Sequence, residues 1–309
     1  MSKQRKNLLN TTSVKNNTHG VKKLNKLLKT LVFDGQLSLS VLDTTDMVNQ
    51  AIKYHGLSPV CAAALGRTMT VCTFMSSGLK NEKDKLSVTV NGNGPCGKIT
   101  VCGNGMLNMR GTIDNPNVDL PLKPNGKLDV GGCVGKDGRI TVIKSMGMKS
   151  PYSGSSDLVN GEIAEDFTAY YAFSEQQPTA MALGVKIGVD GTCVGAGGVI
   201  LQALPFAQEE NLIKAEEIIN QLKNLSTLIE TIGVEQIVKE YFGDVEYQTL
   251  YPEYKCLCSR DYIEKILISL GKAELYDILE KEGKIEVGCE FCNKKYIFNQ
   301  DDVRKLIGE

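Results

Sequence analysis

The spacing of hydrophobic positions divides the chain near residue 205. Before that point, short β-branched runs are bounded by Gly, Asn, Pro and Asp, which is typical of strands. The clearest runs are LSVTV (86–90), KITVC (98–102), RITVIK (139–144) and VKIGV (185–189). Most of the 31 glycines also fall here, as the turns and bulges of a sheet require. The first two thirds of the chain is therefore predicted to be β-rich.

Two helices are predicted within this β-rich part. The Ala-rich segment SPVCAAALGRTMTVCTFMSSGL favours a helix over about residues 59–79. A shorter helix is expected to start at the cap formed by residues 43–46 (DTTD) and to end near Tyr54. Together with the strands, they predict an α+β domain over residues 27–204, with helices on one side of a sheet.

A different pattern begins after Pro205, where apolar residues recur at spacings of three and four with charges between them. These positions are Ile213, Ile218, Ile219, Leu222, Leu225, Leu228, Ile229, Ile232, Ile237 and Val238. They predict two amphipathic helices broken near Gly233, within a helical linker over residues 205–254. The apolar stripe must cover something. A packed arm is the ordinary interpretation, and a detachable lid over an apolar surface is the alternative.

Four cysteines near the C-terminus carry the strongest chemical signal. Cys256 and Cys258 are separated from Cys289 and Cys292 by thirty residues of mostly helical character. This C-x-C-x30-C-x2-C spacing is typical of a four-thiolate metal site, because the long connection can fold back and join the two pairs. Thiolates alone favour zinc, with an iron–sulfur cluster as the main competitor and four ordinary buried cysteines as the third interpretation.

Such a site would be structural, since four protein ligands leave no open position for hydrolytic chemistry. The segment over residues 255–309 is also too short to build a sufficient core alone, so it would depend on a metal. Cys289 and Cys292 alone could form a thioredoxin-like dithiol, but the segment lacks a βαβ context. A dithiol oxidoreductase therefore remains an alternative function.

Composition places the protein among soluble globular chains. It has 309 residues, of which 42% are hydrophobic and 23% charged. No apolar run reaches the roughly 18–20 residues of a membrane span, and no signal-peptide core is present. We therefore expect no membrane partner and a cytoplasmic location, where the ten cysteines would be metal ligands, redox thiols or buried residues.

Charge is distributed unevenly along the chain. Residues 1–33 contain eight Lys or Arg and no acidic residue, whereas residues 205–309 contain 21 acidic and 13 basic residues. Residues 1–26 are predicted to be a basic, disordered arm, with an RNA-binding tail or a transit peptide as functional alternatives. The acidic C-terminal part argues against a zinc-ribbon nucleic-acid-binding protein, which normally presents a basic face to phosphates.

Other motifs give no catalytic site. The glycine-rich segments 92–97 and 191–198 lack the helix or the Lys-Ser/Thr ending of nucleotide-binding loops, so they are interpreted as turns. His55 is interpreted as a helix-end residue, and His19 lies in the basic arm. Glu162, Glu165 and Asp166 are assigned capping or solvated roles. The protein is therefore predicted not to be an enzyme.

Six further cysteines are scattered singly and are interpreted as small core residues. They are Cys61, Cys72, Cys96, Cys102, Cys133 and Cys193.

Taken in order, several segments resemble the heat shock protein 33 family of redox-regulated holdase chaperones. The segments are FDG (33–35), AAALGR (62–67), NPNVDLPL (115–122), GKLDV (126–130), VGKDG (134–138), GEIAEDF (161–167), SEQ (174–176) and the C-x-C…C-x-x-C tail. They cover roughly residues 29–305.

The resemblance implies one zinc ion per chain in the reduced protein, held by Cys256, Cys258, Cys289 and Cys292. It further implies that oxidation links Cys256 to Cys258 and Cys289 to Cys292 and expels the metal. If the helices of residues 209–242 rest on the zinc-binding segment, its unfolding would free them and expose apolar surface. The implied activity is ATP-independent binding of unfolded or oxidatively damaged client proteins, by a chain that forms a homodimer when active.

Overall fold

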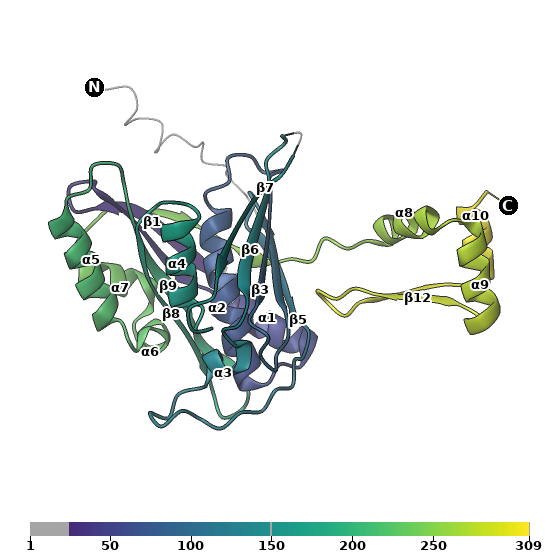
Figure 1. Cartoon of the computed structure of the whole chain (residues 1–309), viewed down its shortest axis with the longest axis horizontal. Helices are drawn as coiled ribbons and strands as arrows, with labels where there is room; N and C mark the ends of the chain where they lie inside the picture. Colours follow the sequence, from purple (N-terminus) through teal and green to yellow (C-terminus); the bar gives the residue numbers. More distant parts are fainter. Residues whose placement is uncertain (1–24, 149, 309) are drawn as a thin grey trace, which may run out of the picture.

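The computed structural model describes residues 25–148 and 150–308 and contains two large sheets, a small hairpin and ten helices within those ranges (Figure 1). The α+β class is confirmed, with β-rich, helical and four-cysteine parts in the predicted order. One feature differs from expectation, because the strands form two sheets with a helix between them. Of the predicted basic arm only Asn25 and Lys26 are described, and Lys26 begins the first strand.

A five-stranded antiparallel sheet has the order β10-β1-β2-β9-β8. Its strands are β1 (Lys26–Val32), β2 (Leu37–Asp43), β8 (Thr179–Ile187), β9 (Cys193–Ala203) and β10 (Gln248–Leu250). Residues 185–187 of the predicted strand at 185–189 are the end of β8. Of the glycine-rich segment 191–198, only residues 191 and 192 lie in the turn. The interpretation as a turn was wrong for residues 193–198, which begin β9, where glycines allow neighbouring backbone to approach closely.

A six-stranded sheet has the order β11-β5-β4-β3-β6-β7. Its strands are β3 (Lys85–Asn91), β4 (Ile99–Asn104), β5 (Asn108–Ile113), β6 (Arg139–Ser145), β7 (Tyr152–Asp157) and β11 (Glu253–Tyr254). All neighbours are antiparallel except β11 and β5, which run parallel. The three remaining predicted strands fall on β3, β4 and β6, and segment 92–97 is the connection between β3 and β4.

Helix α2 (Pro59–Ser76) lies between the two sheets and is buried at every position except Pro59 and Arg67. Its small and apolar residues surround the whole helix, as burial on all sides requires. The hydroxyl groups of Thr68, Thr70 and Thr73 donate to carbonyl oxygens one turn earlier, so they are satisfied inside the core.

Three shorter helices complete this part of the fold: α1 (Thr45–His55), α3 (Val130–Val134) and α4 (Ala164–Phe173). The start of α4 is fixed by Asp166, whose carboxylate accepts backbone N–H groups from Val159, Asn160, Gly161 and Ile163 at 2.7–3.2 Å. The structural role predicted for this acidic residue is confirmed.

The amphipathic segment forms three helices, α5 (Glu209–Gln221), α6 (Leu225–Thr231) and α7 (Gly233–Phe242), with the predicted break at Gly233 and a second one after Gln221. They pack on the face of the five-stranded sheet opposite α2, where Leu39, Val41 and Val199 meet their apolar stripe. The helices therefore form a packed arm on this sheet, and the condition that they rest on the four-cysteine segment is not met.

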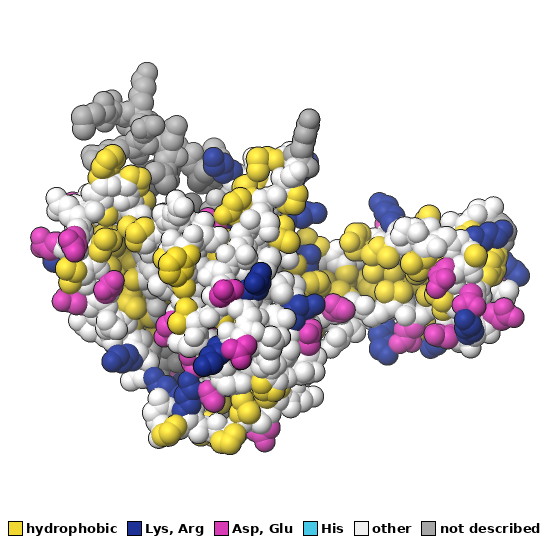
Figure 2. Space-filling view, in the orientation of Figure 1, with side chains coloured by type: hydrophobic (Ala, Val, Ile, Leu, Met, Phe, Trp, Pro, Cys, Tyr) yellow, Lys and Arg dark blue, Asp and Glu magenta, His cyan; other side chains and the backbone are white. Residues whose placement is uncertain are grey.

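The C-terminal residues form a separate small unit that projects from the two-sheet body (Figure 1). It contains α8 (Arg260–Leu270), α9 (Lys272–Glu282), the hairpin β12 (Ile285–Gly288) and β13 (Lys295–Phe298), and α10 (Gln300–Leu306). Hydrophobic side chains remain exposed on it (Figure 2), including Tyr262, Ile266 and Leu270, which follow one stripe of α8. None of the described helices is long and apolar enough to cross a membrane.

Candidate metal centre

The four C-terminal cysteines come together where the small unit meets the body. Cys256 and Cys258 follow β11, and Cys289 and Cys292 lie in the turn between β12 and β13. All four Sγ atoms lie within 4.8 Å of one another, and the sulfurs of Cys256 and Cys289, like those of Cys258 and Cys292, are 3.5 Å apart. No other group of three or more potential ligands gathers this way in the described part of the chain.

This geometry fits one tetrahedral metal ion. Zinc–sulfur bonds of about 2.3 Å place tetrahedral thiolates about 3.8 Å apart, which is close to the observed separations. A disulfide would require sulfurs about 2.05 Å apart, so these thiols are separate. An iron–sulfur cluster is wider than a single ion and would spread the four thiolates further. The cluster could therefore hold one ion, and its all-sulfur ligand set is suited to zinc.

The hairpin turn orients the second cysteine pair. The backbone N–H of Cys289 donates to Lys294 O at 3.0 Å, and the N–H of Asn293 donates to Cys289 O at 2.8 Å. Asn293 has a φ of 55°, a left-handed conformation that asparagine tolerates better than most residues. The turn thus directs Cys289 and Cys292 toward the same point, opposite the incoming Cys256 and Cys258.

Three of the four thiols have a shifted pKa before any metal binds. Burial raises the pKa of Cys256 and of Cys292. Burial also acts to raise the pKa of Cys258, but hydrogen bonds from Tyr296 and the neighbouring thiols outweigh it and lower that pKa to about 7. The Tyr296 hydroxyl donates to Cys258 Sγ at 3.2 Å. A bound cation would favour deprotonation of all four thiols. The thiol of Cys258 would lose its proton readily, because its pKa is already lowered.

Tyr254 connects the cysteine cluster to the body. This residue of β11 pairs with Met109 of β5 and stands two positions before Cys256. Its hydroxyl oxygen lies 2.5 Å from the carbonyl oxygen of Phe291, a residue between Cys289 and Cys292 in the sequence. The same hydroxyl oxygen lies 2.9 Å from Gly111 O in β5. The hydroxyl therefore lies between the β12–β13 turn, which carries Cys289 and Cys292, and the six-stranded sheet.

Further contacts surround this connection. The Arg110 guanidinium lies over the Phe291 ring, 5.0 Å from its centroid. The side-chain amide of Asn293 donates to Tyr54 O at the end of α1. The His55 Nε2 atom lies 3.0 Å from Gly111 O, and burial lowers the pKa of this histidine, so it is neutral at pH 7.

Sequence reasoning assigned no functional role to Tyr254, Phe291 or Arg110. For Phe291 and Tyr254 the only available signal is position, since Phe291 is inside the C-x-x-C motif and Tyr254 stands two residues before the C-x-C motif. His55 is at the end of α1 as predicted, but it also contributes to this contact.

The remaining candidates are structural within the described residues. Glu162 forms ion pairs with Arg67 and Lys123, which lower its pKa against the opposing effect of burial. Five of the six other cysteines are buried and Cys102 is partly buried. Among them, the sulfurs of Cys61 and Cys133 are 4.0 Å apart. These placements agree with the predicted core roles.

The fold and the cysteine cluster together define a two-sheet α+β protein with a C-terminal four-cysteine cluster that could hold a metal ion. Comparison with known proteins identifies its family. A family model described as "Hsp33 protein" matches residues 25–299. The chain belongs to the Hsp33 family of chaperones, and the resemblance noted in the sequence is confirmed.

Several relatives support the assignment. The "33 kDa chaperonin" of Alkaliphilus oremlandii is 42% identical over 92% of this chain and 97% of its own length. The "33 kDa chaperonin" of Ruminiclostridium cellulolyticum is 45% identical over 86% of this chain and 92% of its own length. A crystal structure of the Hsp33 homologue from Thermotoga maritima matches with a TM-score of 0.82 and 32% identity, over 92% of this chain and 98% of that one.

Proposed function

We propose that this protein is a redox-regulated, ATP-independent holdase chaperone of the cytoplasm, and not an enzyme. The observation that carries the proposal is the gathering of four thiols within 4.8 Å at the contact between the small C-terminal unit and the body. Four parts are assigned: a basic arm (1–26), a chaperone core (27–204), a helical linker (205–254) and a redox-switch domain (255–309).

In the reduced protein, Cys256, Cys258, Cys289 and Cys292 would hold one zinc ion per chain. When bound, the ion supplies a structural cross-link and keeps all four sulfurs as thiolates. The residues around it have separate tasks: the β12–β13 turn orients Cys289 and Cys292, and Tyr296 stabilises the thiolate of Cys258.

Oxidation by a peroxide would convert the four thiolates into two disulfides, Cys256–Cys258 and Cys289–Cys292. Formation of each disulfide takes two electrons from a pair of thiolates, and these electrons reduce one molecule of hydrogen peroxide to two waters with uptake of two protons. The metal would then leave, because its ligands no longer carry negative charge. This local pairing is implied by the family, whereas two sulfur contacts of 3.5 Å run across the cluster, from Cys256 to Cys289 and from Cys258 to Cys292.

The pairing matters because local disulfides close very short loops and restrain the unfolded chain little. Crosswise disulfides would instead keep the two ends of the C-terminal unit joined. Structural zinc contributes about 10–16 kcal/mol to small modules, which is comparable to the roughly 5–15 kcal/mol that stabilises a whole domain. Loss of zinc with local pairing would therefore unfold the redox-switch domain.

Unfolding of this domain would release the linker through the chain that joins them. Tyr254 would lose its hydrogen bond to Phe291 O, and the short strand β11 would lose the support of that contact. Strand β10 would be affected next, because it ends only two residues before β11 begins. Helices α5–α7 could then leave the five-stranded sheet and expose Leu39, Val41 and Val199. Unfolded clients would bind such apolar surface without directional contacts, and exposed surface of this kind would also favour a homodimer.

The decisive experiment measures zinc release and chaperone activity together. Peroxide with mild heat should release about one zinc per chain and should strongly suppress aggregation of a denatured enzyme. The reduced, zinc-loaded protein is the control and should suppress aggregation weakly. Zinc retention in the active protein, or equal activity of the reduced protein, would contradict the proposal. Mass-spectrometric mapping of the disulfides then tests the local pairing directly.

A further inference from the structure

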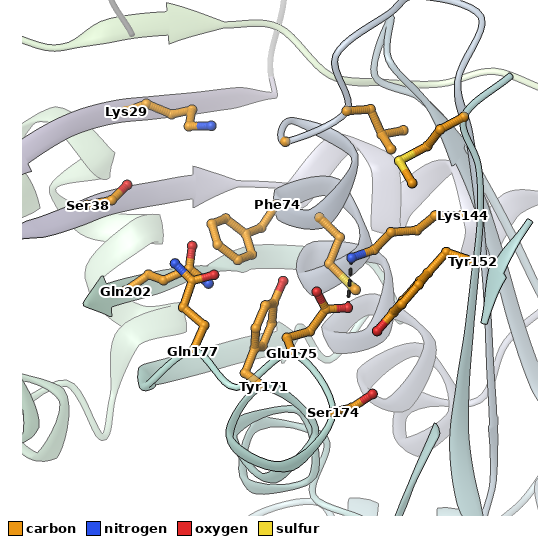
Figure 3. Close-up of a pocket in the computed structure, with 14 residues that line it drawn as sticks. Lys29, Ser38, Phe74, Lys144, Tyr152, Tyr171, Ser174, Glu175, Gln177 and Gln202 are labelled. Carbon is orange, nitrogen blue, oxygen red and sulfur yellow. Dashed lines mark hydrogen bonds and ion pairs between the residues drawn. The ribbon is translucent and has the colours of Figure 1, made fainter. Parts of the chain in front are cut away.

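A cavity of about 400 Å³ opens between the two sheets near the C-terminal end of α2. Its lining combines β1, β2 and β9 of the five-stranded sheet with β6 and β7 of the six-stranded sheet and with the chain that follows α4. Figure 3 shows Lys29 and Lys144 extending into this space from opposite sides, with the rings of Phe74 and Tyr171 between them. The cavity is remote in sequence from the cysteine cluster.

The two lysines are not equivalent. Lys144 Nζ forms an ion pair with Glu175 Oε1 at 2.7 Å, and the Tyr170 hydroxyl donates to the same oxygen at 2.6 Å. The single carboxylate among the lining residues is therefore already paired.

Lys29 contacts only neutral acceptors in the described structure. Its Nζ lies 3.0 Å from Ser77 Oγ and 3.4 Å from Ser77 O. These contacts place the ammonium at the end of α2, where a cation interacts favourably with the helix dipole. This structural role accounts for its position but leaves its charge without a carboxylate. Burial lowers the pKa of Lys29, as expected for an ammonium group without a carboxylate partner.

One part of the cavity lining suits a small apolar body. Phe74, Met75 and Tyr171 are only 7%, 6% and 5% exposed, so together they present a compact apolar surface among the lining residues. The rings of Phe74 and Tyr171 are tilted at 57° with centroids 5.9 Å apart. The rest of the lining is largely polar and includes the side-chain amides of Gln177 and Gln202 (Figure 3). Because Lys144 and Glu175 neutralise each other, Lys29 leaves one net positive charge beside the apolar surface, and such a combination suits a small ligand with one charged group.

We propose that this cavity binds a carboxylate carried on a compact apolar body, with the Lys29 ammonium pairing the carboxylate and the Phe74 and Tyr171 rings contacting the apolar part. The carboxylate could belong to a free small acid or to the C-terminal residue of a polypeptide, which offers the same chemistry. An occupant would touch both sheets. The inference does not depend on the proposed redox function, because it uses no residue of the cysteine cluster.

The test compares three probes on the full-length, reduced protein by titration with protein-observed NMR. The probes are 3-phenylpropionate, its neutral amide 3-phenylpropionamide, and N-acetylphenylalanine as a mimic of a polypeptide C-terminus. The acid should bind with shifts confined to the cavity. The amide should bind at least about tenfold more weakly, the effect of losing a charge-assisted hydrogen bond. The amide comparison needs no variant, so it holds even if a substitution disturbs folding.

Lys29→Met supplies the second arm, because it removes the charge and keeps an unbranched side chain. It should weaken binding of the acid about tenfold and leave the amide unchanged. Lys85→Met, at an exposed lysine of β3, is the matched control and should change neither. Binding of the acid should also weaken as the pH rises through the lowered pKa of Lys29, since the ammonium is then lost.

The outcomes separate clearly. Binding of 3-phenylpropionate alone identifies a free small acid as the ligand class, and equal or tighter binding of N-acetylphenylalanine identifies a polypeptide terminus. Equal affinity for acid and amide, unchanged affinity in a folded Lys29→Met protein, or absence of saturable binding up to about 10 mM would each overturn the proposal.

Discussion

The two-sheet body and the C-terminal unit achieve their order in different ways. The cluster of buried hydrophobic residues around α2 has 41 members, drawn from both sheets. The corresponding cluster of the C-terminal unit has eight, among them Ile263, Leu275 and Phe298. A core of eight side chains is too small to hold a unit of this length securely, because small domains bury too little of their surface. We therefore expect the body to fold through its core and the C-terminal unit to need a cross-link at its cysteines.

The largest test of this comparison is removal of metal without oxidation. A strong chelator under reducing conditions should unfold the C-terminal unit, because it loses a contribution of about 10–16 kcal/mol. Hydrogen exchange should rise throughout α8–α10 and stay slow in α2. Restored protection after addition of zinc is the control. Persistent protection of α8–α10 without metal would show that the small core is sufficient after all.

A second test loosens the linker instead of the metal unit. Gly184 and Gly195 let α6 approach the five-stranded sheet closely, and a Cβ atom at Gly195 would lie 2.2 Å from Ser226 O. Gly195→Ala should therefore displace α6, at a cost of about 1–3 kcal/mol. Hydrogen exchange in α5–α7 should rise, and the reduced protein should gain aggregation-suppressing activity while keeping its zinc.

Gly78→Ala is the matched control, because the nearest atom to its added Cβ would be Met75 O at 3.4 Å, an ordinary contact. If Gly195→Ala opens the linker and the protein stays inactive, the surface under α5–α7 is not the client-binding surface.

A third test cuts the connection between the two regions. Tyr254→Phe removes the hydroxyl that lies between Phe291 O and Gly111 O, at a cost of about 1–2 kcal/mol. Zinc should remain bound in the reduced protein, but peroxide should release it several-fold faster because the turn is less well held. Stopped-flow measurement with a zinc indicator checks the rate. Tyr262→Phe, at an exposed position on α8, should leave it unchanged.

The smallest expected effect concerns one hydrogen bond at the cysteine cluster. The Tyr296 hydroxyl donates to Cys258 Sγ at 3.2 Å, and such a bond stabilises a thiolate. Tyr296→Phe should therefore leave zinc bound in the reduced protein but weaken its affinity about threefold, because the cluster loses one hydrogen bond to a ligand. Competition with a chromogenic zinc chelator measures the affinity, and Tyr247→Phe, at an exposed position, serves as control. An unchanged affinity would show that the hydroxyl does not stabilise the Cys258 thiolate.

Local sequence signals predicted part of the fold. β-Branched runs between turn residues identified β3, β4, β6 and the end of β8, and the spacing of three and four identified the linker helices with their break at Gly233. The cysteine spacing identified the cluster, because paired ligands are encoded locally. The division into two sheets was missed, since strand pairing depends on contacts between distant residues that no local pattern specifies.

The contact between the β12–β13 turn and the body was missed for a related reason. Arg110 and Tyr254 have ordinary strand positions, and only their meeting at Phe291 gives them a role. The partner of α5–α7 could not be predicted, because an apolar stripe indicates that a face is covered but not by what. The helices cover alternate residues of β2 and β9.

The stretch from β10 to β11 has one more consequence. These strands are separated by two residues, yet β10 borders β1 in one sheet and β11 borders β5 in the other. Detachment of this one segment would expose β1 and β5 as edge strands at the same time, each with a row of unpaired backbone donors and acceptors. An extended, damaged polypeptide can pair with such an edge as an added strand, so one reaction at the sulfurs would expose two edges for strand addition.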